Sequence, residues 1–107
     1  MIERIERLTE MLASTPNDDF LKHALALENI KIGKDAVAKI LFEEILTNNP
    51  SYVGSYYHLA KLLERQGENE SALLVYETGM KQANAVGDKH AHNELMMARD
   101  DNDAYEF

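Results

Sequence analysis

Cysteine is absent from this 107-residue chain, which excludes a disulfide framework, a thiolate metal site and a cysteine nucleophile. Long apolar runs are also missing. Charged residues interrupt the opening segment MIERIERLTEML every two or three positions, so it offers neither a signal-peptide core nor a membrane span. Positive charge is scarce, since 11 lysines and arginines face 19 acidic residues and give a formal net charge of -8. We therefore expect a cytoplasmic protein without membrane or nucleic-acid partners, because such a chain repels phosphate.

Sequence patterns for catalysis and metal binding are equally scarce. No serine lies in a GxSxG elbow, and the glycines are too scattered to form a phosphate-binding loop. Glu43 and Glu44 are neighbours on a predicted helix and diverge, whereas a catalytic acid–base pair must converge on one substrate. His90 and His92 point to different helix faces, while paired metal ligands need a spacing of three or four. The sequence predicts no enzyme, no cofactor and no metal.

A repeat of 34 residues is the main positive feature of the sequence. Shifting the chain by 34 positions aligns Pro16 with Pro50 and Gly33 with Gly67. The same shift aligns further apolar rows, which are Leu25–Ala26 with Leu59–Ala60, Ala38 with Ala72, Leu8 with Phe42 and Tyr76, and Leu12 with Leu46 and Met80. Rows of this kind arise when each repeat packs the same face against its neighbour.

The apolar spacing inside each repeat is helical, as in the series Ala38, Leu41, Phe42 and Ile45. We predict six helices, over residues 2–13, 17–32, 35–48, 52–66, 69–84 and 88–100. Gly33 and Gly67 are expected to end helices in the left-handed conformation, and Asp35 and Asn69 to act as N-caps of the helices that follow. The connections are short, so consecutive helices should pack antiparallel.

These residues resemble the tetratricopeptide repeat (TPR) family. The second unit supplies Tyr56, Leu59, Ala60, Leu63, Gly67, Ala72 and Tyr76 at the positions of the motif, and the first supplies Leu25, Ala26, Gly33, Ala38, Phe42 and Pro50. Lys22 and Asn29 depart from the pattern, since they stand where bulky packing residues are usual. The resemblance implies an all-α fold of antiparallel helical hairpins, stacked as a short right-handed solenoid.

The resemblance also implies a division of the chain. We expect one domain over residues 1–100, with a half repeat at 1–16, one repeat at 17–50, another at 51–86 and a capping helix at 87–100. Residues 101–107 form an acidic tail that we expect to be flexible, since Asp101, Asp103 and Glu106 gather negative charge there beside Tyr105 and Phe107.

In the family, the first helix of each hairpin lines a concave groove that holds a peptide or helix of a partner protein. Carried onto this chain, these are helices 17–32, 52–66 and 88–100. The residues that we expect to line the groove are Phe20, His23, Leu27, Lys31, Tyr57, His58, Lys61, Arg65, His92 and Arg99. The resemblance therefore implies a protein-interaction adaptor, and the chain itself should be a monomer or a weak homo-oligomer.

Two rows of these residues suggest what the groove recognises. Lys31, Arg65 and Arg99, which we call the basic strip, recur every 34 residues and could pair with acidic groups of a partner. Alternatively, these cations merely lie near helix C-termini, where the helix dipole favours them. His58 and His92 form a second row, suited either to peptide contact or to ordinary packing.

Self-association is the alternative function. The helix at 2–13 exposes one end of the repeat stack, and an open end of this kind invites stacking on a second copy of the chain.

Overall fold

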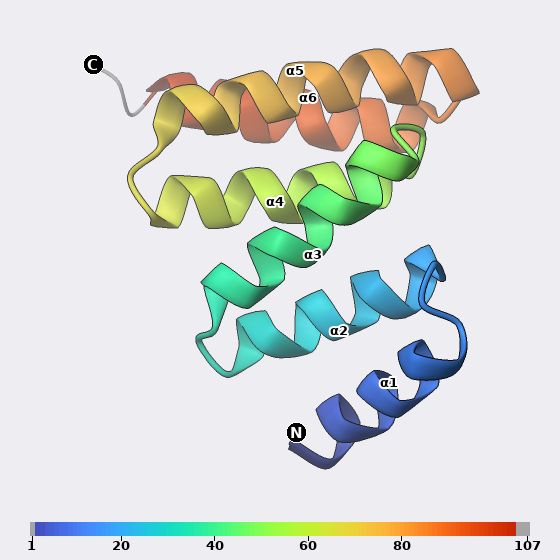
Figure 1. Cartoon of the computed structure of the whole chain (residues 1–107). Coiled ribbons are helices and arrows are strands. Elements are labelled where there is room, and N and C mark those ends of the chain that lie inside the picture. Colours follow the sequence, from blue (N-terminus) through green and yellow to red (C-terminus); the bar gives the residue numbers. More distant parts are fainter. Residues whose placement is uncertain (1, 105–107) are drawn as a thin grey trace. The chain divides into compact units, whose positions relative to one another are not determined.

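A computed structural model of the chain describes the backbone of residues 2–104 and the side chains of residues 2–102. Within residues 2–104 the chain forms six helices and no strand (Figure 1). They are α1 (Ile2–Ser14), α2 (Asp19–Lys31), α3 (Asp35–Asn48), α4 (Gly54–Arg65), α5 (Asn69–Val86) and α6 (Lys89–Ala104). The predicted all-α fold is confirmed, and the helix bounds differ most at the end of α6.

Glycines end helices α2 and α4 as predicted. Gly33 and Gly67 have φ angles of 79° and 78°, a left-handed conformation that only glycine adopts without steric cost. After Gly33, the amide of Lys34 donates to the carbonyl of Asn29 at 2.8 Å, which closes the last turn of α2. The reversal of direction between the two helices of each hairpin therefore follows directly from the glycine positions.

The prediction that Asp35 and Asn69 cap the following helices was wrong. Both are the first helical residues of α3 and α5, so the caps fall one position earlier, at Lys34 and Glu68. The reason is that Lys34 serves both helices: its amide closes α2, and its carbonyl accepts a hydrogen bond from the amide of Ala38 at 3.2 Å. A turn this tight leaves no separate residue for a side-chain cap.

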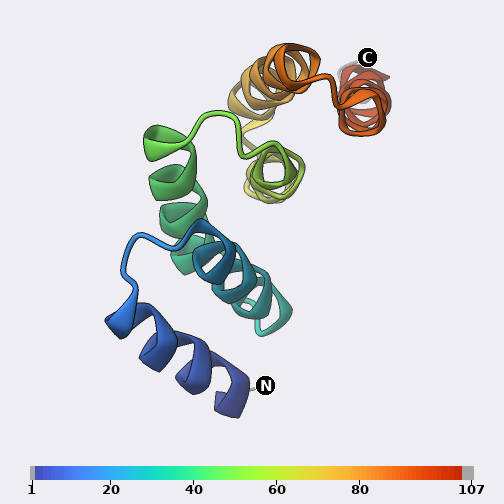
Figure 2. The same cartoon turned by 90° about the vertical axis from the view of Figure 1, so that its right-hand side faces the viewer.

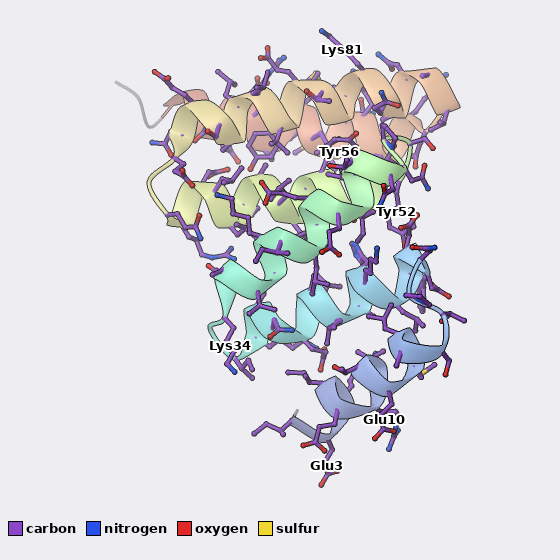
Figure 3. All side chains as sticks on the ribbon, in the orientation of Figure 1. Glu3, Glu10, Lys34, Tyr52, Tyr56 and Lys81 are labelled. Carbon is purple, nitrogen blue, oxygen red and sulfur yellow. The ribbon has the colours of Figure 1, made fainter. Side chains whose placement is uncertain are left out.

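The chain comprises two compact units, Met1–Asn48 and Asn49–Phe107. In the first unit, α2 packs against both α1 and α3 (Figure 2). Its core joins α1 to α2 through Leu8, Leu21 and Leu25, and Ile5, Leu12, Ala24 and Leu41 pack around these three. The apolar residues Ile5, Leu8 and Leu12 of α1 thus pack within this unit. The charged residues Glu3 and Glu10 lie on the side of α1 that faces away from α2 (Figure 3).

The two polar departures from the family pattern are both accommodated in the first unit. Lys22 is buried, and its ammonium lies 3.7 Å from the carboxylate of Glu44 on α3. Asn29 is also buried, and its side-chain amide donates to the carbonyl of Leu25 at 2.9 Å. Each buried polar group therefore has a partner, which removes most of the cost of its burial.

In the second unit, α5 packs against α4 and α6, and α4 also contacts α6. Consecutive helices run in opposite directions (Figure 1). All three helices meet at Gly79 of α5, because a Cβ atom added there would lie 2.7 Å from Cβ of Tyr56 and 2.9 Å from Cδ1 of Leu95. Tyr56 projects from α4 into this contact (Figure 3). The absence of a side chain at Gly79 is what lets the helices approach so closely.

The end of α6 differs from the sequence-based expectation. Residues 101–104, which we assigned to a flexible tail, continue the helix to Ala104. Asn102 is buried, and its side-chain amide donates to the carbonyl of Asn69 at 3.4 Å, which ties the last turns of α6 to the start of α5. Residues 105–107 of the expected tail lie outside the described residues. The division into half repeat, two repeats and cap stays a prediction.

Candidate functional site

The predicted groove residues of the first unit all lie on α2 but have different surroundings. Phe20 is 69% exposed, in the first turn of the helix. His23 is half-buried, and its ring stands edge-on to that of Phe42, with the centroids 5.6 Å apart. Leu27 is half-buried as well. Lys31 is the last residue of α2, and its ammonium lies 2.8 Å from the carboxylate of Glu28.

In the second unit, α4 brings Tyr57, His58 and Lys61 together. The rings of Tyr57 and His58 are edge-on to one another, with their centroids 5.4 Å apart. The ammonium of Lys61 lies 5.8 Å from the centroid of the Tyr57 ring, within the range of a cation–π contact. The four-residue spacing of Tyr57 and Lys61 places them one above the other on the same helix face.

These two side chains line a hollow between α4 and α6. Its lining consists of Tyr57 and Lys61 from α4 and of Glu94, Met97, Ala98 and Asp101 from α6, and its volume is about 200 Å³. We call it the α4–α6 hollow. Met97 is 66% exposed, so a large apolar side chain stands open to solvent on the wall of this hollow.

Glu64 links Lys61 to Tyr76 through an ion pair and a hydrogen bond. The ammonium of Lys61 lies 3.9 Å from the carboxylate of Glu64, which accepts a hydrogen bond from the hydroxyl of Tyr76 on α5. Burial raises the pKa of the Tyr76 hydroxyl well above its usual range, and the hydrogen bond to Glu64 raises it further. Tyr76 therefore stays a neutral donor to the carboxylate of Glu64.

Burial also determines the charge of His58. It lowers the pKa of the imidazole, and Arg65 lowers it further, whereas Glu94 on α6 acts in the opposite direction. Because the pKa falls below the ordinary value of 6.5, His58 is neutral at pH 7. It adds no positive charge beside the hollow.

The remaining predicted residues do not line the α4–α6 hollow. Arg65 is the last residue of α4, and Arg99 on α6 contacts Asp100, with a guanidinium nitrogen 3.1 Å from its carboxylate. His92 is half-buried. Two members of the basic strip, Lys31 and Arg65, thus lie in the last turn of their helices, as the helix-dipole interpretation expects.

The sequence-based prediction assigned α6 to the groove but missed the four α6 residues that line the hollow. Glu94, Met97, Ala98 and Asp101 have the i, i+3, i+4, i+7 spacing of a single helix face, which is a signal that the sequence does carry. The 34-residue rows hid it, because they assume that α6 presents the same face as α4. Lys61 and Leu95 occupy equivalent positions, yet the Lys61 side chain is 34% exposed and Leu95 is 1% exposed.

Across residues 2–102, no three His, Asp or Glu side chains lie close enough together to hold one metal ion. Within the described part of the chain, no helix combines the length and the apolar character needed to cross a membrane.

Comparison with solved structures places this arrangement in a known family. The solution structure of a tetratricopeptide repeat domain protein from Salinibacter ruber superposes with a TM-score of 0.80 and 37% identity, covering 83% of this chain and 90% of that one. A crystal structure of a tetratricopeptide repeat domain protein from the same organism gives a TM-score of 0.78 and 37% identity, with coverages of 81% and 97%. No protein-family model and no curated protein sequence matches the chain.

A third structure shares the fold at lower identity. The solution structure of a Bordetella parapertussis protein superposes with a TM-score of 0.83 at 24% identity, covering 95% of this chain and 89% of that one. With its helical hairpins, its 34-residue rows and these relatives, the chain belongs to the tetratricopeptide repeat family. The predicted helical-repeat fold is confirmed, and membership of the family indicates in general terms a module for protein–protein interaction.

Proposed function

We propose that this chain is a protein-interaction adaptor and that its second unit binds a peptide or helix of a partner protein in the α4–α6 hollow. The observation that carries the proposal is the position of Met97, a large apolar side chain that is 66% exposed and lines the same hollow as Tyr57. Apolar and aromatic side chains that line a concave surface supply most of the energy of a protein interface.

The size of the hollow supports a side-chain ligand. Its volume of about 200 Å³ lies below the range of roughly 300–1,000 Å³ that is typical of small-molecule sites. A hollow of this size suits one side chain of a partner that continues over the neighbouring surface of α4 and α6. In this proposal the chain acts by binding and not by catalysis, and it needs no cofactor or metal.

A double variant tests the proposal. Tyr57→Ala with Met97→Ser removes the two large side chains of the hollow. A partner captured by the intact chain from a lysate of the source cell should then bind the purified variant at least about tenfold more weakly. The matched control is Leu74→Ser with Val86→Ser, which removes two exposed apolar side chains of α5 instead. If the control loses as much affinity while both variants keep the circular dichroism of the parent, the hollow is not the binding surface.

Self-association through the terminal helices is the second candidate function. Ile2 and Met11 of α1 are 67% and 47% exposed, and they are the apolar groups that a second copy would cover. Light scattering over a range of concentrations tests this candidate. A molar mass that stays at that of one chain excludes it.

A further inference from the structure

The charges around the α4–α6 hollow are predominantly negative. Glu94 and Asp101 line it from α6, and Lys61 is the one cation among its lining residues. Lys61 is itself accompanied by Glu64, with 3.9 Å between the ammonium and the carboxylate. His58, on the neighbouring turn of α4, is neutral at pH 7 because burial lowers its pKa. The hollow therefore carries more negative than positive charge, which disfavours an acidic ligand.

The carboxylates of the hollow have no cationic partner within the described chain. Among residues 2–102, no lysine or arginine forms an ion pair with Glu94 or Asp101. The nearby Arg99 contacts Asp100 instead, at 3.1 Å. Both carboxylates are exposed, so binding a cation there costs them little desolvation.

The rest of the lining suits the stem of a long basic side chain. Tyr57 contributes an aromatic face, Met97 a flexible thioether and Ala98 a methyl group. Lysine and arginine carry a charged head on an apolar stem, and they pack this stem on apolar surface while the head contacts polar groups. That Lys61 already lies over the ring of Tyr57 indicates that a cation is favourable at this point.

We propose that the α4–α6 hollow takes a lysine or arginine side chain of a partner peptide, with its stem on Met97 and Ala98 and its head between Glu94 and Asp101. This inference rests on the proposed function and specifies the chemistry of the partner. It differs from the sequence-based expectation, in which the basic strip receives acidic groups. The net charge of -8 would draw a basic partner toward the chain from a distance.

The first experiment is a titration of the full ¹⁵N-labelled chain, followed by NMR at low ionic strength. The probes are four peptides of sequence acetyl-Ala-Leu-X-Leu-Ala-amide, in which X is arginine, lysine, glutamine or glutamate. The arginine and lysine peptides should produce saturable shifts at the amides of Tyr57, Lys61, Met97 and Ala98. The glutamate peptide should bind at least about threefold more weakly. Absence of saturable shifts at these amides with the arginine peptide, or tighter binding of the glutamate peptide, overturns the proposal.

Charge variants then distinguish a basic ligand from an acidic one, because the two hypotheses predict opposite changes in the affinity for the arginine peptide. Glu94→Gln with Asp101→Asn should weaken binding of the arginine peptide by about three- to tenfold. Lys61→Met, which keeps most of the stem and removes the charge, should strengthen it. The matched control Glu43→Gln with Glu77→Gln removes two exposed carboxylates from α3 and α5 and should change the Kd by less than about twofold. If Lys61→Met weakens binding, or the control weakens it as much as the α6 variant, the proposal is wrong.

The inference and the proposed function can fail separately. If the Tyr57→Ala, Met97→Ser variant loses its captured partner but the arginine peptide does not bind the hollow, the hollow remains the docking surface and only the basic ligand is wrong. If that variant keeps its partner, the proposed function fails whatever the peptides do.

Discussion

The hydroxyl of Tyr76 in α5 donates a hydrogen bond to the carboxylate of Glu64 in α4, and this bond joins the core of the second unit to the α4 residues near the hollow. The ring of Tyr76 is fully buried, and Glu64 lies beside Lys61 at the α4–α6 hollow. The same aromatic position of the repeat therefore serves two purposes. It fills the core and it holds a charged residue in place near the surface.

Replacement of Tyr76 by phenylalanine should destabilise the chain. The substitution keeps the buried ring and leaves Glu64 without its donor, at a cost of about 1–2 kcal/mol in the free energy of unfolding. Urea denaturation followed by circular dichroism measures this change. Thr78→Val is the control, because it removes a hydroxyl from the exposed surface of the same helix, where loss of its bond to the carbonyl of Leu74 should cost less than about 0.5 kcal/mol. Equal effects of the two substitutions would contradict the structural role of the Tyr76 bond.

The stability of the chain should fall at alkaline pH. Burial raises the pKa of both Tyr56 and Tyr76 above the value of an exposed tyrosine, so the unfolded chain releases these protons first. The contribution of these two tyrosines to the free energy of unfolding is complete below the pKa of about 10 that they have in the unfolded chain. It is lost as the pH rises from there toward their higher pKa values in the folded chain. Urea midpoints measured between pH 8 and pH 11 should therefore decrease. The decrease should be smaller in Tyr76→Phe, and an identical slope would argue against this origin.

Gly79→Ala should destabilise the second unit although alanine favours helices. The new methyl group would lie 2.7 Å from Cβ of Tyr56 and 2.9 Å from Cδ1 of Leu95, and overpacking of this kind costs about 1–3 kcal/mol. Gly54→Ala is the matched control, because nothing lies within 4 Å of an added Cβ there. Thermal unfolding should show a lower Tm for the first variant and an unchanged or higher Tm for the second. A raised Tm in Gly79→Ala would contradict this prediction, because it would mean that α4 and α6 move away from α5 at little cost in free energy.

The attachment of α1 to α2 should depend on the charge of Glu28. Its carboxylate lies 2.8 Å from the ammonium of Lys31 and 3.5 Å from Nε of Arg4. The hydrogen bond from Lys31 lowers the pKa of Glu28, and the charges of Lys31 and Arg4 act in the same direction against the effect of burial. The resulting stability is present above the ordinary pKa of 4.5 and is lost as the pH falls through the lower value of the folded chain.

Glu28→Gln should consequently lower the urea midpoint at pH 7 and make it depend less on pH in the acidic range. The control is Glu10→Gln on the outer side of α1 (Figure 3). Hydrogen exchange of the α1 amides at pH 7 adds a local measurement, and protection equal to that of the parent would contradict the role of Glu28.

Leu8 is the residue of α1 whose truncation should matter most. It is buried against Leu21 and Leu25, so Leu8→Ala should cost about 2–4 kcal/mol in the free energy of unfolding. Met11→Ala on the same helix is the control, since Met11 is 47% exposed and its truncation should cost under about 1 kcal/mol. Urea denaturation distinguishes the two. If Leu8→Ala is no more harmful than Met11→Ala, α1 contributes little to the core of its unit.

The repeat could be predicted because its determinants are local or recur at a fixed interval. Gly33 and Gly67 end helices through their own backbone conformation, and Phe42 and Tyr76 are buried because each repeat needs the same packing residue. The caps were misplaced by one residue for a different reason. Whether Lys34 or Asp35 is the cap depends on how tightly the hairpin turns, which the side-chain preferences alone do not specify.

The amino-acid sequence by itself thus determined six helices, their antiparallel hairpins and the family, since these depend on periodicity and punctuation. Only the tertiary structure decided which face of α6 meets α4. Leu95 turns inward against Gly79, and Glu94, Met97 and Asp101 are thereby directed to the hollow beside Tyr57 and Lys61. The rotation of a helix about its own axis follows from the packing of all its neighbours, and the 34-residue rows did not predict it for α6.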